Sequence, residues 1–157
     1  MSMKVRTVFL GLAVGLMSAA PALAQDTCEG VRSSTSAKLS FQVMGIRSAK
    51  GEVALTLYPD DKRRFLAKGG KFARVRTKAQ SVVKGCFGVP PGSYALAIYH
   101  DSNGDRDFNR TLVGLPAEGF GFSNNPDTKI GLPALSAVRF SVGSGERSLS
   151  IQMRYLR

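Results

Sequence analysis

The chain has 157 residues, with 22 lysines and arginines against 11 aspartates and glutamates, so its formal net charge is +11 at pH 7. One domain with one apolar core accounts for that length. The chain has no tryptophan and only 8% aromatic residues, which argues against a base-stacking platform and hence against a nucleic-acid partner.

The first 24 residues have the pattern of a secretory signal peptide. Lys4 and Arg6 form a positive region, an apolar run follows, and Ala22-Leu23-Ala24 offers the small residues that a signal peptidase reads. The run is shorter than the roughly 20 apolar residues of a membrane-spanning helix. We therefore predict cleavage after Ala24 and a periplasmic or secreted protein without a transmembrane anchor; an uncleaved anchor is the alternative. The mature charge would be 20 − 11 = +9.

The two cysteines bear on how the mature chain is organised. We divide it into an N-terminal segment, residues 25–37, and a single domain, residues 38–157. Export would place Cys28 and Cys86 where disulfides persist, and a bond between them would tie the N-terminal segment to the middle of the domain. Two separate buried thiols are the alternative. The sequence has no Cys-x-x-Cys pair, so we do not expect a structural zinc site.

Short alternating runs separated by glycine and proline predict strands. The first two flank the turn Arg47–Gly51, and we expect them to pair as a hairpin. Residues 60–70 are charged and end in glycines, which indicates a loop. The predicted strands are residues 38–46, 52–59, 72–78, 81–89, 93–101, 137–142 and 148–156. Seven short strands without an amphipathic helix predict an all-β antiparallel sandwich, with an incomplete barrel as the alternative.

Residues 62–78 are strongly basic and contain no acid. Such a field attracts anionic surfaces, which outside the cytoplasm means an acidic envelope polymer such as a polysaccharide, lipid phosphates or a negatively charged protein. The alternative is a solvated face that keeps the protein soluble. The basic residues are Lys62, Arg63, Arg64, Lys68, Lys71, Arg74, Arg76 and Lys78.

A segment of some thirty-five residues after Asp101 lacks a strand signal, and compact domains rarely keep such a length without a use for it. It begins with oxygen-bearing side chains at alternate positions, a spacing that lets a curled loop bind Ca²⁺. Arg106 stands where the sharp turn usually has glycine, and Leu112 where a bidentate glutamate is usual. The same residue types also build Asx-turns without metal. The predicted ligands are Asp101, Asn103, Asp105, Asp107, Asn109 and Glu118.

His100 is the only histidine, at a predicted strand end. Together with Asp101 and Glu118 it suggests a hydrolase-like site. Hydrolysis would also need a nucleophile, and Ser123, the nearest serine, has no nucleophile-elbow motif around it. The simpler interpretation is that His100 fastens the segment to the sheet by hydrogen bonds.

The runs PPGSYALAIYHDSNGDRDFN, GLPAEGFGFSNNP and GLPALSAVRFSV resemble the exported bacterial family known as domain of unknown function 2141. The resemblance covers residue 39 to the C-terminus and implies an immunoglobulin- or transthyretin-like sandwich with no established activity. Arg106 and Asn109 depart from the family pattern, which weakens the metal interpretation. Phe120 and Phe122 are expected either to pack the loop down or to form a ligand platform. The motif loop consists of Gly119, Phe120, Gly121, Phe122, Ser123, Asn124 and Asn125.

We therefore expect a non-enzymatic binding or envelope-associated module, its acidic loop ordered by Ca²⁺ if a cofactor is present. A periplasmic enzyme using His100, Asp101 and Glu118 is the first alternative. Adhesion to an anionic envelope polymer through residues 62–78 is the second.

Overall fold

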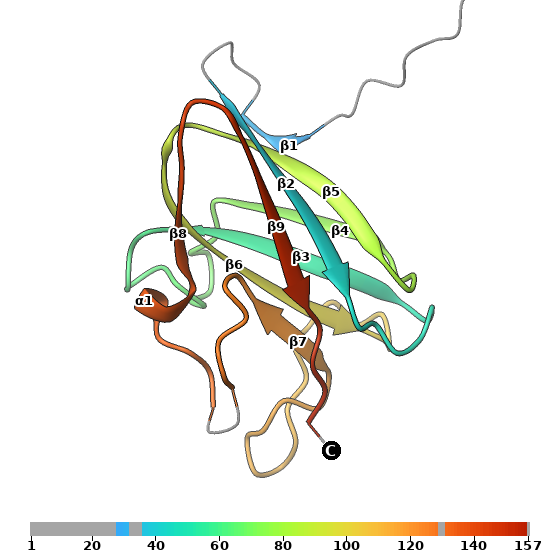
Figure 1. The fold of residues 1–157 in the computed structure, drawn as a ribbon. Helices are drawn as coiled ribbons and strands as arrows, with labels where there is room; N and C mark the ends of the chain where they lie inside the picture. The colour runs from blue at the N-terminus through green and yellow to red at the C-terminus, as the bar shows by residue number, and fades with distance from the viewer. Residues whose placement is uncertain (1–27, 32–35, 129–130, 157) are drawn as a thin grey trace, which may run out of the picture.

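The computed structural model of the chain describes residues 28–31, 36–128 and 131–156 (Figure 1). The predicted signal peptide and its cleavage site lie outside these residues. Within the described part of the chain, no helix is long and apolar enough to cross a membrane.

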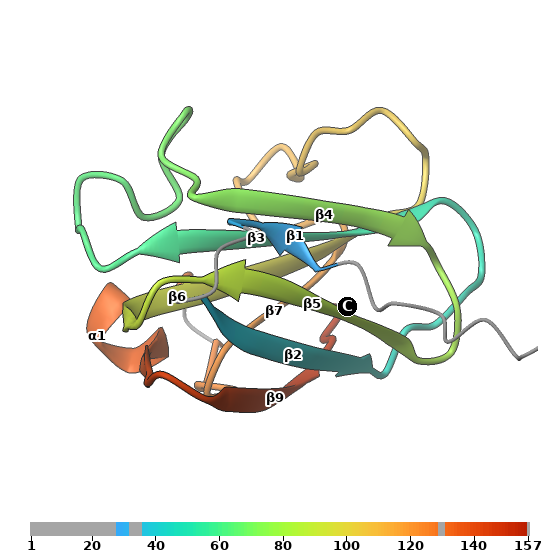
Figure 2. The same cartoon turned by 90° about the horizontal axis from the view of Figure 1, so that it is seen from above.

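Two sheets pack face to face, as the sequence predicts (Figures 1 and 2). The first has the order β1-β5-β2-β9, made of β1(Glu29–Gly30), β5(Val83–Val89), β2(Ala37–Met44) and β9(Glu146–Gln152). The second has the order β4-β3-β6-β7, made of β4(Ala73–Lys78), β3(Glu52–Pro59), β6(Gly92–Asp101) and β7(Gly119–Phe122); β8(Arg139–Val142) also pairs with β6. The described residues also contain one short helix, α1(Leu135–Val138). The all-β sandwich is confirmed.

The predicted hairpin between the first two long strands is wrong. β2 pairs with β5 and, in parallel, with β9, whereas β3 pairs with β4 and β6. Both strands bury one apolar face in the same core, but from opposite sheets. Residues 45–51 therefore carry the chain across the sandwich. Alternation along a strand predicts which face is buried and says nothing of the partner strand.

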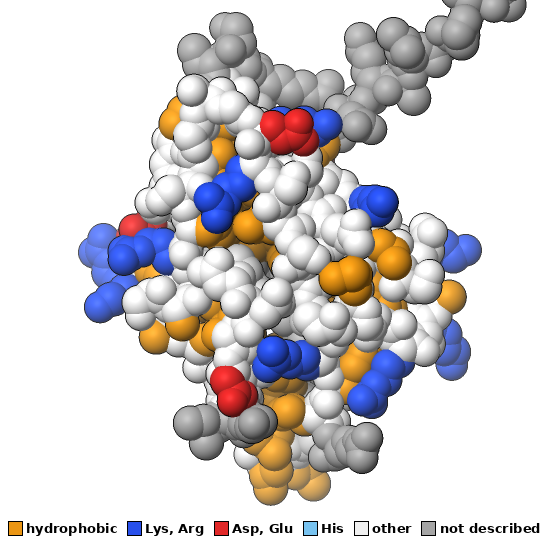
Figure 3. Space-filling view, in the orientation of Figure 1, with side chains coloured by type: hydrophobic (Ala, Val, Ile, Leu, Met, Phe, Trp, Pro, Cys, Tyr) orange, Lys and Arg blue, Asp and Glu red, His pale blue; other side chains and the backbone are white. Residues whose placement is uncertain are grey.

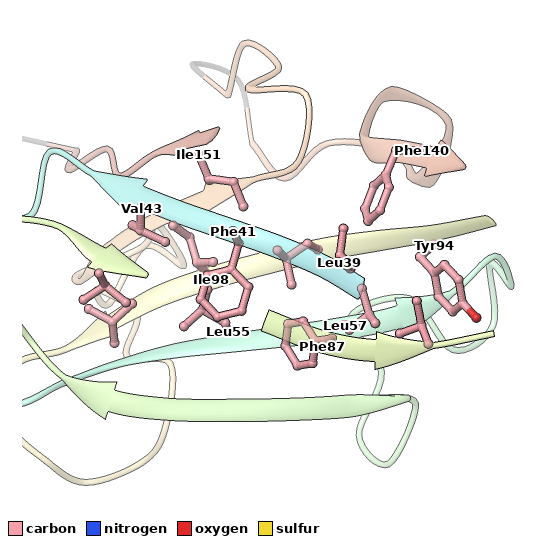
Figure 4. Packing of buried hydrophobic residues seen from close by; sticks show 14 of the residues in the cluster. Leu39, Phe41, Val43, Leu55, Leu57, Phe87, Tyr94, Ile98, Phe140 and Ile151 are labelled. Atoms are coloured by element: carbon pink, nitrogen blue, oxygen red, sulfur yellow. The ribbon is translucent and has the colours of Figure 1, made fainter. Parts of the chain in front are cut away.

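The main core lies between the sheets (Figure 4). Its side chains come from the alternate positions of each strand that the sequence pattern singles out, and Phe41 and Phe87 meet with ring centroids 5.3 Å apart. Fully burying a side chain of this kind contributes roughly 1.5–3 kcal/mol. The most deeply buried members include Leu39, Val43, Val53, Leu55, Leu57, Phe87, Leu96 and Ile151.

Cys28 and Cys86 form a disulfide, which confirms the predicted pairing. β1, directly after Cys28, pairs in parallel with β5, which contains Cys86. The bond closes a loop of 58 residues, and the chain-entropy account assigns such a cross-link about 4 kcal/mol. It fits the predicted export, because disulfides persist in oxidising compartments.

A second, smaller apolar cluster lies on the outer face of the β4-β3-β6-β7 sheet. Figure 2 shows residues 60–70 and 102–118 on the side of β4 that faces away from β2 and β9. The small side chains of Ala54, Ala95 and Ala97 on the sheet leave room for aromatic rings above them. The cluster is completed by Tyr99, Phe120, Phe122, Leu135 and Val138, with Phe65 and Phe108 packed against it.

Candidate functional site

The acidic segment begins with a buried carboxylate. Asp101 is 0% exposed, and its Oδ1 accepts the Gly104 N–H at 2.8 Å while its Oδ2 accepts the Arg106 N–H at 2.9 Å. Both of those residues have positive φ, 77° for Gly104 and 67° for Arg106. Two side-chain-to-backbone bonds of this kind stabilise a tight turn. Asp101 therefore shapes the turn from inside the protein.

Arg76 fixes the same turn to the sheet. Its Nη1 donates to Asp101 Oδ2 at 3.1 Å, and its Nη2 donates to the Tyr99 hydroxyl at 2.6 Å and to the Arg106 carbonyl at 2.9 Å. Its guanidinium also lies over the Tyr99 ring, 5.5 Å from the centroid. The planar guanidinium of arginine can make these three hydrogen bonds at once, and the ammonium of lysine does not offer that geometry.

The basic residues 62–78 therefore divide into two groups. Arg74 and Arg76 are half-buried, and Arg74 donates to Thr56 Oγ1 at 2.8 Å; Arg64 is exposed but donates to the carbonyls of Gly70 and Lys71. The remaining basic residues are exposed as well: Lys62, Arg63, Lys68, Lys71 and Lys78. Binding of an anionic polymer by this group stays a prediction.

The remaining predicted calcium ligands bond mainly to one another. Asp105 Oδ2 accepts the side-chain amides of Asn103 at 2.8 Å and Asn109 at 2.9 Å, and Asp105 Oδ1 accepts the Asp107 N–H at 2.9 Å. These bonds, led by that of the Asp107 N–H, lower the pKa of Asp105. Among the described residues, no three His, Cys, Asp or Glu side chains gather as a metal site would require. Calcium binding stays a prediction.

His100 is 2% exposed, and both its ring nitrogens have partners. Nδ1 lies 2.7 Å from the Tyr155 hydroxyl and Nε2 lies 2.8 Å from the Lys50 carbonyl. The carbonyl can only accept, so Nε2–H donates to it, and in a neutral ring the Tyr155 hydroxyl donates to Nδ1. The Tyr155 hydroxyl in turn accepts the Arg47 N–H at 3.1 Å. His100 thus joins β6 to residues 47–50 and to the C-terminal segment.

Glu118, the third residue of the predicted catalytic group, is 7% exposed. Its Oε2 accepts the Asn109 N–H at 3.2 Å, and the backbone N–H groups of Asn109 and Ser102 oppose the effect of burial on its pKa. Burial is the main cause that raises its pKa. The bond to Asn109 closes the far end of the acidic turn.

The side chains of the Ser-Asn-Asn run after β7 form hydrogen bonds to backbone groups of neighbouring elements. Ser123, 0% exposed, accepts the Leu96 N–H at 3.0 Å and donates to the Val138 carbonyl. Asn124 donates to the carbonyls of Ala137 and Arg139, at 3.2 and 2.9 Å. These bonds fasten β7 to α1 and β8.

Asn125 performs the same task toward β9. Its side chain donates to the Ser150 carbonyl at 3.0 Å and accepts the Gln152 N–H at 2.8 Å. The amide pairs with the edge of β9 much as a neighbouring strand would. Ser123, Asn124 and Asn125 are therefore accounted for by the fold.

β7 itself was not predicted from the sequence, because two of its four residues are glycines. A Cβ at Gly119 would lie 2.4 Å from the Tyr155 ring, and one at Gly121 would lie 2.6 Å from the Gln152 carbonyl oxygen. Phe120 and Arg154 exchange two backbone hydrogen bonds of 2.8 Å. The glycines thus let β7 approach the end of β9, which joins the two sheets along one side.

A pocket of about 320 Å³ opens on the outer face of the second sheet. Its size lies at the lower end of the roughly 300–1,000 Å³ range of small-molecule sites. Thr56 and Ala97 of the sheet line it, as do Leu66 and Leu132. Aromatic rings form most of the remaining wall: Tyr58, Tyr99, Phe108, Phe120 and Phe122.

These rings form a continuous arc. With Phe65, which packs behind the wall, the order is Tyr58, Phe65, Phe122, Phe120, Phe108 and Tyr99, and consecutive centroids lie 5.5 to 6.4 Å apart. Edge-on and tilted contacts at such distances are the favoured arrangement of aromatic pairs. The wall is therefore preformed by ring packing.

Cations surround the same pocket, and no acid lines it among the residues that the structure describes. Arg110 lies over the Phe108 ring, 5.4 Å from its centroid, and Lys68 is exposed. Tyr58 supplies a phenol whose pKa is raised by burial, against the opposing effect of the nearby Arg74. The cations that line the pocket are Lys68, Arg74 and Arg110.

A second hollow, of about 450 Å³, lies at the end of β9. It is lined by Arg47 and Arg154 and by one aromatic ring, that of Tyr155, whose hydroxyl is already bonded to His100. With a single ring it offers less apolar contact surface than the first pocket.

The sequence indicated only part of the aromatic pocket. Phe120 and Phe122 were identified as a candidate platform, and both line it. Tyr58, Tyr99, Phe108 and Arg110 were missed as lining residues. The outward face of β6, with Ala95 and Ala97 beside Tyr99, was the available signal, because small side chains in a strand leave space above the sheet.

The family comparison identifies the chain. Residues 41–150 match the family described as "Uncharacterized protein conserved in bacteria (DUF2141)". The chain belongs to this family. No curated protein and no solved structure matched it.

Proposed function

We propose that this DUF2141 member is a non-enzymatic binding module that holds a small anionic amphiphile in the aromatic pocket. The observation that carries the proposal is the combination of a preformed wall of rings with three cations and no acid around one cavity. An apolar body would contact the rings, and a carboxylate, sulfonate or phosphate group would meet the cations.

The interior of the pocket supports a ligand with a polar end. Arg74 is held by its bond to Thr56, so its guanidinium is oriented before any ligand arrives. Lys68 lies at the exposed rim, where a long flexible side chain can follow different anions. The site would therefore select for charge and for a flat or flexible apolar body of modest size.

The geometry of His100, Asp101 and Glu118 supports binding over hydrolysis. All three are more than nine-tenths buried, and both ring nitrogens of His100 are occupied by Tyr155 and Lys50. A general base must be within hydrogen-bond reach of a substrate proton. These side chains reach other parts of the fold instead.

Calorimetric titration with 2-naphthoate tests the proposal, with the neutral analogue 2-naphthylmethanol alongside. We expect saturable binding of the carboxylate and weaker binding of the alcohol. Lys68→Ala should weaken naphthoate binding about two- to fivefold, the effect of one exposed charge. Lys62→Ala is the matched control, since it removes an exposed cation of the same loop that does not line the pocket.

Ala97→Leu tests the place of binding. The added carbons would fill the pocket from the sheet side, and naphthoate binding should be lost while the circular dichroism spectrum is retained. Equal binding by wild type and Ala97→Leu, or no saturable binding of naphthoate, would contradict the proposal.

A further inference from the structure

Residues 110–116 form a short hairpin that carries the most exposed apolar side chains of the described chain. Leu112 is fully exposed, Val113 is 80% exposed and Leu115 is 50% exposed. Figure 3 shows hydrophobic side chains gathered at the lower tip of the molecule, where Figure 1 places the 102–118 segment. Scattered single exposed leucines are ordinary, but a contiguous group on one protruding tip indicates an interaction site.

Hydrogen bonds hold the two arms of the hairpin together at its base. The Thr111 N–H donates to the Leu115 carbonyl at 2.8 Å, and the Gly114 N–H donates to the Thr111 carbonyl at 2.9 Å. The Leu115 N–H donates to Thr111 Oγ1 at 3.2 Å, and Arg110 Nη1 donates to the Gly114 carbonyl at 3.0 Å. These bonds fix the base of the hairpin, so Leu112 and Val113 are held at its end with their side chains outward. Insertion of these side chains would leave the backbone of the tip at the level of the headgroups, where water is still present.

The charge of the hairpin is of one sign. From Arg110 to Ala117 the only charged side chain is Arg110, which lies at the base of the hairpin, and the whole chain has a net charge of +11. Aliphatic side chains at a tip with a cation behind them match a lipid surface, where the apolar region lies beneath anionic headgroups. A convex tip also needs no preformed groove in its partner.

We propose that the 110–116 hairpin docks the protein on anionic lipid bilayers by inserting Leu112, Val113 and Leu115 below the headgroups. The inserting side chains are separate from the aromatic pocket, because Leu112, Val113 and Leu115 do not line it; Arg110 at the base of the hairpin does. It adds a membrane-surface partner to a protein whose described residues contain no spanning helix.

The absence of tryptophan provides a direct test. The Leu112→Trp variant carries a single indole at a fully exposed position, and Val82→Trp carries one at a 39% exposed position outside the hairpin. With vesicles of phosphatidylcholine and phosphatidylglycerol in equal parts, the emission of Leu112→Trp should shift to the blue. The emission of Val82→Trp should stay unchanged.

Vesicle flotation supplies the second measurement. The double variant Leu112→Ser/Val113→Ser should lose at least tenfold in partitioning onto these vesicles, and wild type should partition less onto phosphatidylcholine alone. Wild type and variants are compared as the predicted mature chain, residues 25–157, so that the apolar run of the signal peptide does not bind the vesicles. Val82→Ser is the control and should float like wild type.

Three outcomes would overturn the proposal. One is flotation that the double substitution leaves unchanged. The second is emission of Leu112→Trp that stays at the solvent-exposed wavelength with vesicles present. The third is a blue shift of Leu112→Trp that rises with protein concentration without vesicles, because it would identify a second copy of the chain as the partner. Naphthoate binding by the double variant is measured in parallel. If the variant still binds naphthoate, a change in flotation concerns the hairpin alone and leaves the pocket proposal untouched.

Discussion

The two halves of the long segment after β6 differ in what their side chains contact. In residues 101–109 the polar groups bond to one another and to the sheet, with Asp101, Asp105 and Glu118 each accepting backbone N–H groups. In residues 110–116 hydrogen bonds close the base of a hairpin and the apolar side chains face outward. The acidic half is thus held to the sheet by its own polar groups, and the apolar half is the part that we propose contacts lipid.

Substitution of Asp101 removes the acceptor that holds the acidic turn to Arg76, and we expect it to cause the largest loss of folding stability. Asp101→Ala leaves Arg76 and two turn N–H groups without their acceptor, and breaking a buried pair costs about 3 kcal/mol or more. Urea unfolding measures the loss. Asp107→Ala, an exposed aspartate of the same turn, should change stability by no more than about 0.5 kcal/mol. Equal effects would mean that Asp101 has no special role in the turn.

Gly121→Ala would separate β7 from the end of β9. Its Cβ would meet the Gln152 carbonyl, and overpacking of this kind costs roughly 1–3 kcal/mol. Gly143→Ala is the matched control, because no atom lies within 4 Å of its added Cβ. A smaller loss for Gly121→Ala than for Gly143→Ala in thermal unfolding would contradict the close approach of the two strands.

Substitution of Glu118 should cause the smallest change in the free energy of unfolding, and this change should depend on pH. Burial raises its pKa above the ordinary 4.5, so the folded state holds this proton more tightly than the unfolded chain does. The resulting stabilisation is fully present below pH 4.5 and is lost as pH rises through the raised pKa. Glu118→Gln removes this dependence, so its unfolding free energy relative to wild type should increase between about pH 4 and pH 7. Parallel pH curves would show that burial does not raise this pKa.

Period-two alternation in the sequence was enough to predict the sandwich and the buried face of strands such as Phe41–Val43 and Leu55–Leu57. It could not predict that β2 and β3 lie in different sheets, because both bury the same pattern against one core. β7 escaped prediction because its glycines reflect close approach to β9, which is a tertiary contact.

The same limit applies to the candidate site. Oxygen-bearing residues at alternate positions suggest a metal as readily as a hydrogen-bonded turn, and only Arg76, brought in from β4, reveals how Asp101 is used. The aromatic pocket joins Tyr58, Tyr99 and Phe108 from separate elements, so no local spacing could reveal it. The role of Asp101 and the lining of the pocket both depend on contacts between distant segments, which local sequence patterns do not predict.

The parallel pairing of β2 with β9 has a mechanical consequence. Seven register pairs run from Lys38 opposite Glu146 to Met44 opposite Gln152. A force that pulls the start of β2 away from the end of β9 acts along these strands, so the whole ladder bears the load in shear instead of opening one pair at a time. Forced unfolding is governed by the height of such a barrier. A load applied before Cys28 would reach this ladder through the disulfide to Cys86 in β5, the strand that pairs with the other side of β2.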